Sequence, residues 1–331
     1  MAIWSGSVKI YLLIFLVSFV VAFYSISLLL PRLQLAGITG KDVNKPGTPE
    51  VVEMGGLGIA AGFGSGILLA IALESFFGQV IAVDLVALFA GLSTIAIVVI
   101  IGILDDLLVL SQGVKAFLPV FASLPVLSIN VGKTVMQIPL IGRVDFGIIY
   151  PLILVPLGIT GAANGANMLA GFNGLEVGMG IVAASALAFI AFTLKETTSL
   201  VLLLALLGAL LATFYYNRYP ARILIGDVGT LSIGSVIATS VILGNFESAG
   251  VIIIVPYFID FLIKAVNHFP SKGWWGSYKD GKLYCPNSKP VSLCQWIMKL
   301  SGGISEQNLV LTLIVIEAIF GLVAILMFVM R

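Results

Sequence analysis

The sequence predicts an all-α polytopic membrane protein with about ten transmembrane helices in a single transmembrane domain over residues 1–331. Hydrophobic residues make up 60% of the chain and charged residues only 10%, whereas a soluble domain carries roughly a quarter charged residues. Apolar stretches of about twenty residues, long enough to cross the hydrocarbon core, recur along the chain. Lipid offers the backbone no hydrogen-bond partners, so these stretches are expected to be helices.

The predicted spans are residues 8–30, 55–73, 80–103, 114–130, 147–163, 178–194, 198–215, 226–244, 250–268 and 306–330. The first exceeds the ~7–15-residue apolar core of a secretory signal and shows no small-residue cleavage site, so we expect a retained span. Two β-prone runs over Lys133–Phe146 predict a short hairpin on the outer side. Residues 269–305 form the predicted cytosolic loop between the last two helices.

Lysine and arginine are distributed unequally between the two sets of alternate loops. One set holds twelve of the seventeen: Arg32, Lys41, Lys45, Lys115, Arg218, Arg222, Lys264, Lys272, Lys279, Lys282, Lys289 and Lys299. The other set and the termini hold Lys9, Lys133, Arg143, Lys195 and Arg331. Because cytosolic loops are enriched in these residues, the first set should face the cytosol and both termini the outside. Most acidic and amide side chains follow the first set, which places any chemistry on the inner face.

Two adjacent carboxylates, Asp105 and Asp106, end the third predicted span. Neighbouring carboxylates near lipid are costly unless a cation or hydrogen bonds offset their charge. They indicate a divalent-metal and phosphate site or a proton acceptor, the alternative being a solvated helix end. Lys115 follows at the start of the next span, where it either neutralises a phosphate or marks the inner interface.

The segment from Asn164 to Glu176 is more specific. Asn164 and Asn167 are three residues apart and therefore share a helical face, and the glycines that follow permit the close backbone approach that phosphate-binding loops need. Asp227 opens a later span after a basic, aromatic loop. One carboxylate and one amide oxygen, completed by substrate phosphates, satisfy magnesium. A polar contact between helices is the alternative for the asparagines.

Three features of the C-terminal third have no assigned role. Trp274 and Trp275 either belong to the membrane interface or form a sugar-binding or lipid-binding flap. Glu317 lies inside the last span, where a buried partner is expected. Cys285 and Cys294 lack metal-site spacing and are expected to be reduced. A net charge of +1 gives no reason to expect a nucleic-acid partner.

Together these motifs resemble the polyprenyl-phosphate N-acetylhexosamine-1-phosphate transferases, and most of all the UDP-GlcNAc:dolichyl-phosphate GlcNAc-1-phosphate transferases of eukaryotes and archaea. The resemblance covers nearly the whole chain. It rests on Asp42-Val-Asn44-Lys45, Glu53-Met-Gly-Gly56, Asp105-Asp106 with Lys115, Asn164 to Glu176, Ile225-Gly226-Asp227 and Cys285-Pro286.

The resemblance implies transfer of GlcNAc 1-phosphate from UDP-GlcNAc to a dolichyl-type polyprenyl phosphate, with release of UMP, as a first membrane step of glycan assembly such as N-glycosylation. It implies that Asn167 and Asp227 hold Mg²⁺, with Mn²⁺ as an alternative, and that Asp105, Asp106 and Lys115 are catalytic. Lys115 would meet the diphosphate, and the two aspartates would orient or deprotonate the acceptor. The implied substrate-binding residues are Asp42, Asn44, Lys45, Glu53, Asn164, Gly171, Asn173, Glu176, Leu224 and Lys289.

The chain departs from this family pattern in two places. Asn287-Ser288-Lys289 stands where eukaryotic relatives carry an arginine-histidine-arginine run, and the clustered histidines of the bacterial branch are absent. Leu224 stands where relatives stack an aromatic residue on uracil. The resemblance implies an archaeal plasma membrane, with another UDP-HexNAc or an undecaprenyl acceptor for cell-wall polymers as the alternative.

Two functions of other classes are less favoured. A secondary transporter would show repeated halves and charges near the membrane midplane, and no repeat is visible. A CDP-alcohol phosphotransferase would carry spaced aspartates with glycine and arginine on one helix, which are missing. Direct attack by the lipid phosphate is the preferred mechanism over a two-step route through an aspartyl-phosphate on Asp105 or Asp106. The oligomeric state, a homodimer included, stays open.

Overall fold

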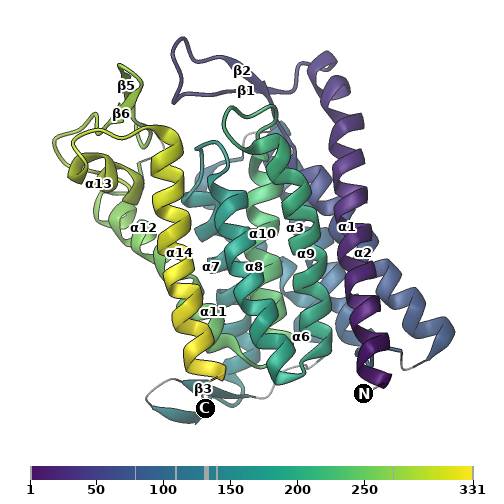
Figure 1. Cartoon of the computed structure of the whole chain (residues 1–331). Helices are drawn as coiled ribbons and strands as arrows, with labels where there is room; N and C mark the ends of the chain where they lie inside the picture. The colour runs from purple at the N-terminus through teal and green to yellow at the C-terminus, as the bar shows by residue number, and fades with distance from the viewer. Residues whose placement is uncertain are drawn as a thin grey trace.

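A computed structural model describes residues 2–78, 80–108, 110–129, 134–138, 141–270 and 272–329. Long helices stand side by side in one bundle (Figure 1). They are α1 (Ala2–Leu35), α2 (Gly56–Phe77), α3 (Leu85–Leu108), α8 (Leu175–Leu194), α9 (Thr197–Asn217), α10 (Gly226–Leu243) and α14 (Glu306–Val329). Within the described residues, these seven are long and apolar enough to cross a membrane. The prediction of an all-α polytopic membrane protein is confirmed.

The predicted count of ten spans is not confirmed. The described residues give eight spans at most, if α11 (Glu247–Ile253) and α12 (Val255–Val266), which meet at a bend of 57°, count as one. Residues 114–130 are divided among α4 (Gln112–Phe117), α5 (Pro119–Ala122) and α6 (Leu124–Ser128). Pro119 and Pro125 have no backbone N–H and interrupt a continuous helix. Residues 147–163 form a π-helix, η1 (Tyr150–Leu154), followed by the short α7 (Val155–Met168).

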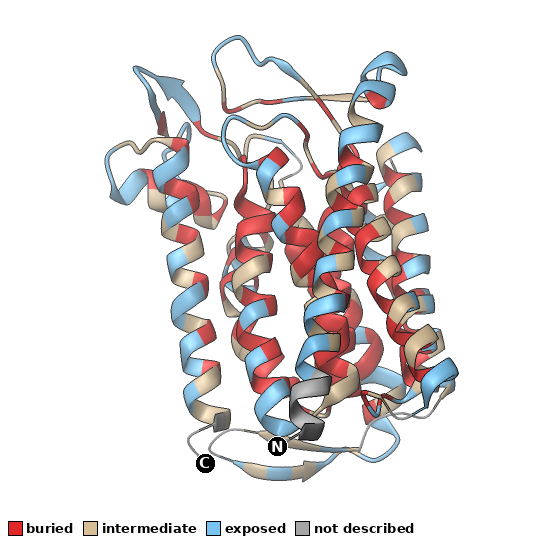
Figure 2. Ribbon diagram, turned by 45° about the vertical axis from the view of Figure 1, so that its right-hand side comes forward, coloured by how far each residue is buried: buried red, intermediate tan, exposed pale blue. Residues whose placement is uncertain are grey.

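Helix α10 lies at the centre of the bundle. Every residue from Val228 to Leu243 is buried, and Figure 2 shows the buried residues concentrated inside the bundle and the exposed ones on its outer faces. A Cβ atom on Gly234 would lie 2.1 Å from the carbonyl oxygen of Ala162, and one on Gly102 would lie 2.4 Å from the Cα of Val228. Small residues therefore allow α7 and α3 to pack directly against α10, as membrane helices commonly do.

The two ends of the bundle differ. Both chain termini lie at one end, together with the antiparallel pair β3 (Val135–Ile138) and β4 (Gly142–Asp145), which falls in the predicted hairpin (Figure 1). Lys133 lies outside the described residues, and the membrane side of this hairpin stays a prediction. The opposite end, called the loop end below, carries the pairs β1 (Thr39–Lys41) with β2 (Glu50–Val52) and β5 (Ser277–Lys279) with β6 (Lys282–Tyr284), and helix α13 (Leu293–Leu300).

Candidate active site

A cavity of about 1230 Å³ runs through the bundle between α7, α10 and α12. Lys41, Asp42 and Glu53 line it at the loop end, and Met136 of β3 and Tyr150 line it toward the opposite end. The side chains that line the cavity change from polar to apolar along its length. Charged and amide side chains gather near the loops, whereas Leu154, Leu157, Ile237, Val241, Ile242, Phe258 and Phe261 make an apolar wall further in. Tyr150 and Glu247, which bond to each other, line the far end. The cavity can therefore hold a molecule that is ionic at the loop end and apolar along the middle of the bundle.

Lys115 of α4 bridges two carboxylates from different helices. Its Nζ lies 2.6 Å from Asp105 Oδ2 of α3 and 2.6 Å from Asp227 Oδ2 of α10. Asp105 also accepts a hydrogen bond of 2.9 Å from the Leu110 backbone N–H, and its side chain is 3% exposed. Asp105 is buried and Asp227 is partly buried, so the lysine offsets the cost of two negative charges placed close together.

Asp106 holds the first turn of α10. Its Oδ1 accepts from the Asp227 N–H at 2.7 Å, and its Oδ2 accepts from the Val228 N–H at 3.2 Å. These are unpaired donors at a helix N-terminus, where a carboxylate also interacts favourably with the helix dipole. Gly226 has a φ of +66°, and a Cβ there would lie 2.5 Å from Asp106 Oδ2. Glycine is therefore required immediately before Asp227, because a larger residue at position 226 would collide with the Asp106 carboxylate that positions Asp227.

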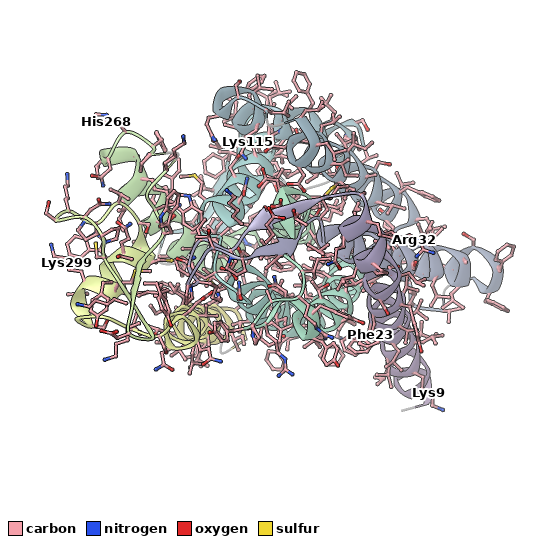
Figure 3. All side chains as sticks on the ribbon, turned by 90° about the horizontal axis from the view of Figure 1, so that it is seen from above. Lys9, Phe23, Arg32, Lys115, His268 and Lys299 are labelled. Atoms are coloured by element: carbon pink, nitrogen blue, oxygen red, sulfur yellow. The ribbon has the colours of Figure 1, made fainter. Side chains whose placement is uncertain are left out.

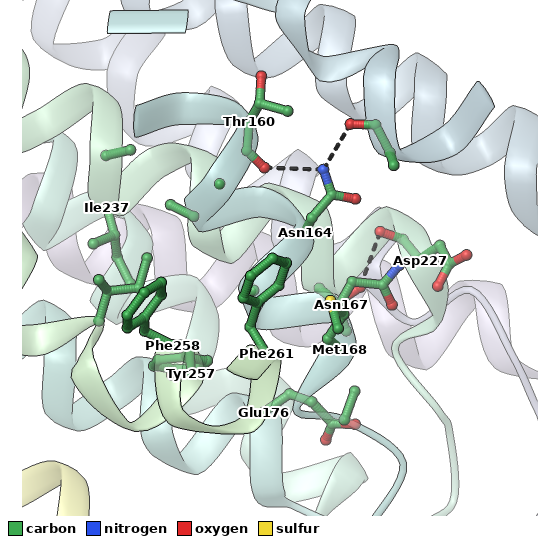
Figure 4. A pocket seen from close by; sticks show the side chains of 18 of the residues that line it. Thr160, Asn164, Asn167, Met168, Glu176, Asp227, Ile237, Tyr257, Phe258 and Phe261 are labelled. Atoms are coloured by element: carbon green, nitrogen blue, oxygen red, sulfur yellow. Dashed lines mark hydrogen bonds between the residues drawn. The ribbon is translucent and has the colours of Figure 1, made fainter. Parts of the chain in front are cut away.

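The two asparagines of α7 have different roles. Asn164 donates from Nδ2 to the Ala116 carbonyl and to the Thr160 carbonyl, both at 3.0 Å, and so ties α7 to α4. Asn167 lines the cavity one turn later. Figure 4 labels Asn167 and Asp227 among the side chains that line this cavity. In the part of the chain that the structure describes, no hydrogen bond occupies the Asn167 side chain. Its amide oxygen is available to a ligand.

A second set of polar residues is cross-linked at the loop end. Asn173 donates from Nδ2 to Asp42 Oδ2 at 3.0 Å, accepts at Oδ1 from the Ala221 N–H at 2.9 Å, and donates its backbone N–H to Glu306 at 2.8 Å. Lys45 forms ion pairs with Asp42, at 3.1 Å, and with Glu306. These contacts join the β1–β2 region, the loop after α7 and the first turn of α14.

The loop at Gly171 is enclosed by the 269–305 segment. Gly171 has a φ of +101°, and a Cβ on it would lie 2.0 Å from the Cη2 atom of Trp274. Its N–H donates to Glu176, and its carbonyl accepts from Asn44 Nδ2 at 2.9 Å. Asn44 Oδ1 in turn accepts from the Gly276 N–H at 3.1 Å. The Trp274 ring therefore lies directly on the glycine loop and lines the cavity there.

Known proteins are similar to this chain over nearly its full length. The model of glycosyl transferase family 4 matches residues 88–245, from within α3 to just beyond α10. A protein of Saccharolobus solfataricus, provisionally named UDP-N-acetylglucosamine–dolichyl-phosphate N-acetylglucosaminephosphotransferase, is 37% identical over 322 residues, 96% of each chain. The chain belongs to glycosyl transferase family 4.

More distant members of this family come from eukaryotes and bacteria. The UDP-N-acetylglucosamine–dolichyl-phosphate N-acetylglucosaminephosphotransferase of Dictyostelium discoideum is 26% identical, over 86% of this chain and 80% of its own. A Bacillus subtilis protein, provisionally named undecaprenyl-phosphate N-acetylglucosaminyl 1-phosphate transferase, is 28% identical, over 73% of this chain and 67% of its own. The prediction from the motifs, a membrane enzyme of this family, is confirmed.

The structure brings most of the predicted site residues of this transferase to one cavity. Those that line it are Asp42, Glu53, Lys115, Asn164, Asn167, Gly171, Asn173, Glu176, Leu224 and Asp227. Asp105, Asp106, Asn44 and Lys45 lie behind this lining and hold it through the contacts described above. Lys289 is exposed and does not line the cavity. His268, the only histidine, is also exposed, at the rim of the molecule in Figure 3.

Burial changes the ionisation of one carboxylate beside the site. Glu53, in the loop after β2, has its pKa raised by desolvation and, to a smaller extent, by the negative charge of Asp227. Both residues line the cavity. A cation placed between them would remove this repulsion, since an opposite charge favours the ionised form.

Two acidic residues that organise the site have no role assigned from sequence. Glu306 begins α14 and links Lys45 to the Asn173 backbone. Asp260 of α12 is fully buried and forms an ion pair of 2.8 Å with Lys264. Lys264 itself was predicted to lie in a cytosolic loop, but it is buried on α12 and lines the cavity. The signal that could have found this pair is its i, i+4 spacing inside an apolar segment, because charges there are rare unless paired.

The residues present fit a magnesium ion bound with a substrate. No group of three His, Cys, Asp or Glu side chains suited to a metal occurs among the described residues, so a cage made by the protein alone is not indicated. Magnesium usually takes one or two carboxylates and completes its shell with water and substrate phosphates. The Asp227 carboxylate and the Asn167 amide oxygen, both at the cavity wall, meet that requirement.

Proposed function

We propose that this transferase moves N-acetylglucosamine 1-phosphate from UDP-N-acetylglucosamine to a dolichyl-type polyprenyl phosphate in the presence of Mg²⁺. The observation that carries the proposal is the Lys115 bridge between Asp105 and Asp227. Lys115 and Asp227 line the polar part of the cavity. The names of the relatives from Saccharolobus and Dictyostelium supply the donor and the acceptor.

The transfer is a single displacement at phosphorus. An oxygen of the lipid phosphate attacks the phosphorus that bears the sugar, the bond from that phosphorus to the UMP oxygen breaks, and UMP leaves with the electron pair. The products are a lipid-linked sugar diphosphate and UMP. Such reactions depend on in-line positioning and charge neutralisation more than on covalent catalysis. When bound, Mg²⁺ would offset charge on the phosphate oxygens and the leaving group.

The protein side chains have distinct parts in this scheme. Lys115 stabilises negative charge on the diphosphate, and Asp105 fixes the position of its ammonium group. Asp106 keeps Asp227 in place through the first turn of α10. Asn164 sets the distance between α7, which carries Asn167, and α4, which carries Lys115. The apolar wall of the cavity holds the isoprene chain of the acceptor.

Two arguments support direct attack over an aspartyl-phosphate intermediate. A phosphate monoester carries its second negative charge above a pKa of about 6, so the acceptor needs no general base at neutral pH. Asp105 is held by Lys115 and the Leu110 N–H, and both oxygens of Asp106 accept from α10. Neither carboxylate lines the cavity, which leaves each poorly placed to attack a phosphorus atom.

The distribution of charge supports a location and an orientation. Both termini lie at the end opposite the basic loops, which agrees with a cytosolic active site and external termini. An archaeal plasma membrane fits the similarity to the Saccharolobus protein. The bacterial relative makes undecaprenyl phosphate the alternative acceptor.

The test is an assay of the purified protein with Mg²⁺, a panel of radiolabelled UDP-sugars, and either dolichyl or undecaprenyl phosphate. We expect lipid-linked GlcNAc diphosphate and UMP in equal amounts, with dolichyl phosphate preferred and with activity lost in EDTA and restored by Mg²⁺. Release of UDP in place of UMP would show transfer of the sugar alone and would refute the proposal. Label on the enzyme after incubation with β-³²P-labelled UDP-sugar and no lipid would refute direct attack.

A further inference from the structure

One face of α12 forms an aromatic wall that ends in a buried cation. Tyr257, Phe261 and Lys264 follow at i, i+4 and i+7, so they lie on the same side of the helix, and all three line the cavity together with Phe258. Figure 4 shows the three aromatic side chains along the cavity on the ribbon of α12. Phe258 and Phe261 stack with ring centroids 6.0 Å apart. This helix therefore offers an apolar surface followed by one positive charge.

The Lys264 ammonium group keeps part of its hydrogen-bonding capacity. It donates to the carbonyl of Met168 and forms an ion pair of 2.8 Å with Asp260 Oδ2. The Asp260 carboxylate also has a second partner, because its Oδ1 accepts a hydrogen bond of 2.7 Å from the Leu293 N–H of α13. An ammonium group has three N–H donors, and two of these directions are used. Since the side chain lines the cavity, the remaining donor can meet a ligand.

Three lysines are found among the described residues that line the cavity: Lys41, Lys115 and Lys264. Lys41 is exposed on β1, and Lys115 lies between two carboxylates. Lys264 faces one carboxylate and stands at the end of the aromatic wall. Its ammonium group contacts the carbonyl of Met168, which directly follows Asn167 at the end of α7. An amphiphile with an anionic head would meet Lys264 as its apolar tail passes along α12.

We propose that Lys264 binds the phosphate of the acceptor lipid, while Tyr257, Phe258 and Phe261 contact the first isoprene units. The inference rests on the proposed function and assigns the acceptor side of the same site. Buried, charge-assisted hydrogen bonds to phosphate are strong and directional. Lys264 and Asn167, the proposed magnesium ligand, line the same cavity, so a phosphate held by Lys264 shares that cavity with the proposed metal site.

The experiment compares the binding of farnesyl phosphate, farnesol and UMP to purified Lys264→Met protein in detergent, by microscale thermophoresis. The wild type should prefer farnesyl phosphate to farnesol, and the variant should lose about ten-fold of that preference, as expected for one charged hydrogen bond. Binding of UMP should be unchanged. In turnover, KM for polyprenyl phosphate should rise about ten-fold and KM for UDP-GlcNAc less than two-fold.

Loss of Lys264 leaves Asp260 buried without its cation, which can unfold the protein. The double variant Asp260→Asn with Lys264→Met removes both charges and should show the same loss of phosphate preference, and Lys264→Arg should retain the preference. Lys282→Met is the matched control, because Lys282 is an exposed lysine on β6, and it should leave all three affinities unchanged.

Two results would overturn the assignment. An unchanged farnesyl phosphate to farnesol ratio in a folded Lys264→Met or double variant would show that the lysine only holds α7. Weaker binding of UMP with an unchanged lipid ratio would place Lys264 on the nucleotide. Because binding is read without turnover, either result is distinct from failure of the proposed function, which would appear as a wild type that makes no lipid-linked sugar diphosphate.

Discussion

Two polar clusters at the loop end of the bundle contain similar residue types but differ in how far their hydrogen bonds are made within the protein. The scaffold cluster is Asp42, Lys45, Asn173 and Glu306, whose members bond to one another and to backbone groups. The open cluster is Lys115, Asn167 and Asp227, which line the cavity. Asp105 lies behind it and shares Lys115 with Asp227, and the Asn167 side chain has no hydrogen bond among the described residues.

The difference separates groups that stabilise the protein from groups that can bind a ligand. A buried polar group adds stability when its hydrogen bonds are made within the protein, and it costs free energy when they are broken. A polar group at a cavity wall with unused capacity contributes little to stability but is free to meet substrate or metal. The scaffold cluster should therefore control folding and the open cluster turnover, and variants of the two can break or sharpen this contrast.

The largest effect on turnover is expected for Asp227→Asn. The change removes one negative charge from the proposed magnesium site, keeps the shape of the side chain, and leaves the Asp106 contacts to the α10 backbone in place. We expect kcat to fall by about a thousand-fold, as when a main electrostatic contact of a transition state is lost, with an apparent Tm within a few degrees of wild type. Activity above a tenth of wild type would exclude Asp227 as a metal ligand.

Asn167→Ala should give the next largest loss. The side chain lines the cavity, so its removal should reduce kcat by about a hundred-fold and raise the Mg²⁺ concentration needed for half activity. Thermal unfolding should be unchanged. The matched variant is Asn164→Ala, which loses two hydrogen bonds to backbone carbonyls and should lower both Tm and turnover. A large drop in Tm for Asn167→Ala would place this residue in the scaffold.

Asn173→Ala should affect stability more than chemistry. Asn173 is 3% exposed, and truncation removes its bond to Asp42 and leaves the Ala221 N–H unpaired. We expect a loss of about 2–3 kcal/mol in the free energy of unfolding, measured as a lower midpoint in a thermal or denaturant scan. Turnover below the midpoint should fall less than ten-fold. A folded, inactive variant with unchanged Tm would move Asn173 from the scaffold to the open cluster.

The sequence could predict which residues gather at the site but not which of them face the ligand. Adjacent Asp105 and Asp106 look equivalent along the chain, yet successive helix positions differ by about 100° in direction, so one binds Lys115 and the other holds α10. Likewise, Asn164 and Asn167 share a face, and only packing against α4 distinguishes them. Long-range partners such as Glu306 of α14 could not be derived, because nothing in a single sequence pairs it with Asn173.

The number of spans was harder to predict than their positions. Each of the ten predicted segments falls on helical structure in the part of the chain that the structure describes. Hydropathy alone does not register that the prolines at 119 and 125 divide one segment into short helices, or that another bends by 57° between α11 and α12. The bend has a consequence for the site, because α12 carries the aromatic wall and Lys264.

The smallest effect is expected for Lys289→Met. Resemblance to relatives suggested that Lys289 contacts phosphates or sugar, but the side chain is exposed and lies outside the cavity lining. Exposed charges contribute little to stability or to a site they do not touch, so kcat, both KM values and Tm should stay within two-fold or two degrees of wild type, roughly the scatter of such assays. A selective rise of more than about five-fold in KM for the UDP-sugar would mean that residues 269–305 move toward the cavity when substrate binds. In that case Lys289 would supply the positive charge on the sugar side. The site would then consist of the scaffold cluster, the open cluster and a third group of residues that reaches the cavity only when substrate binds.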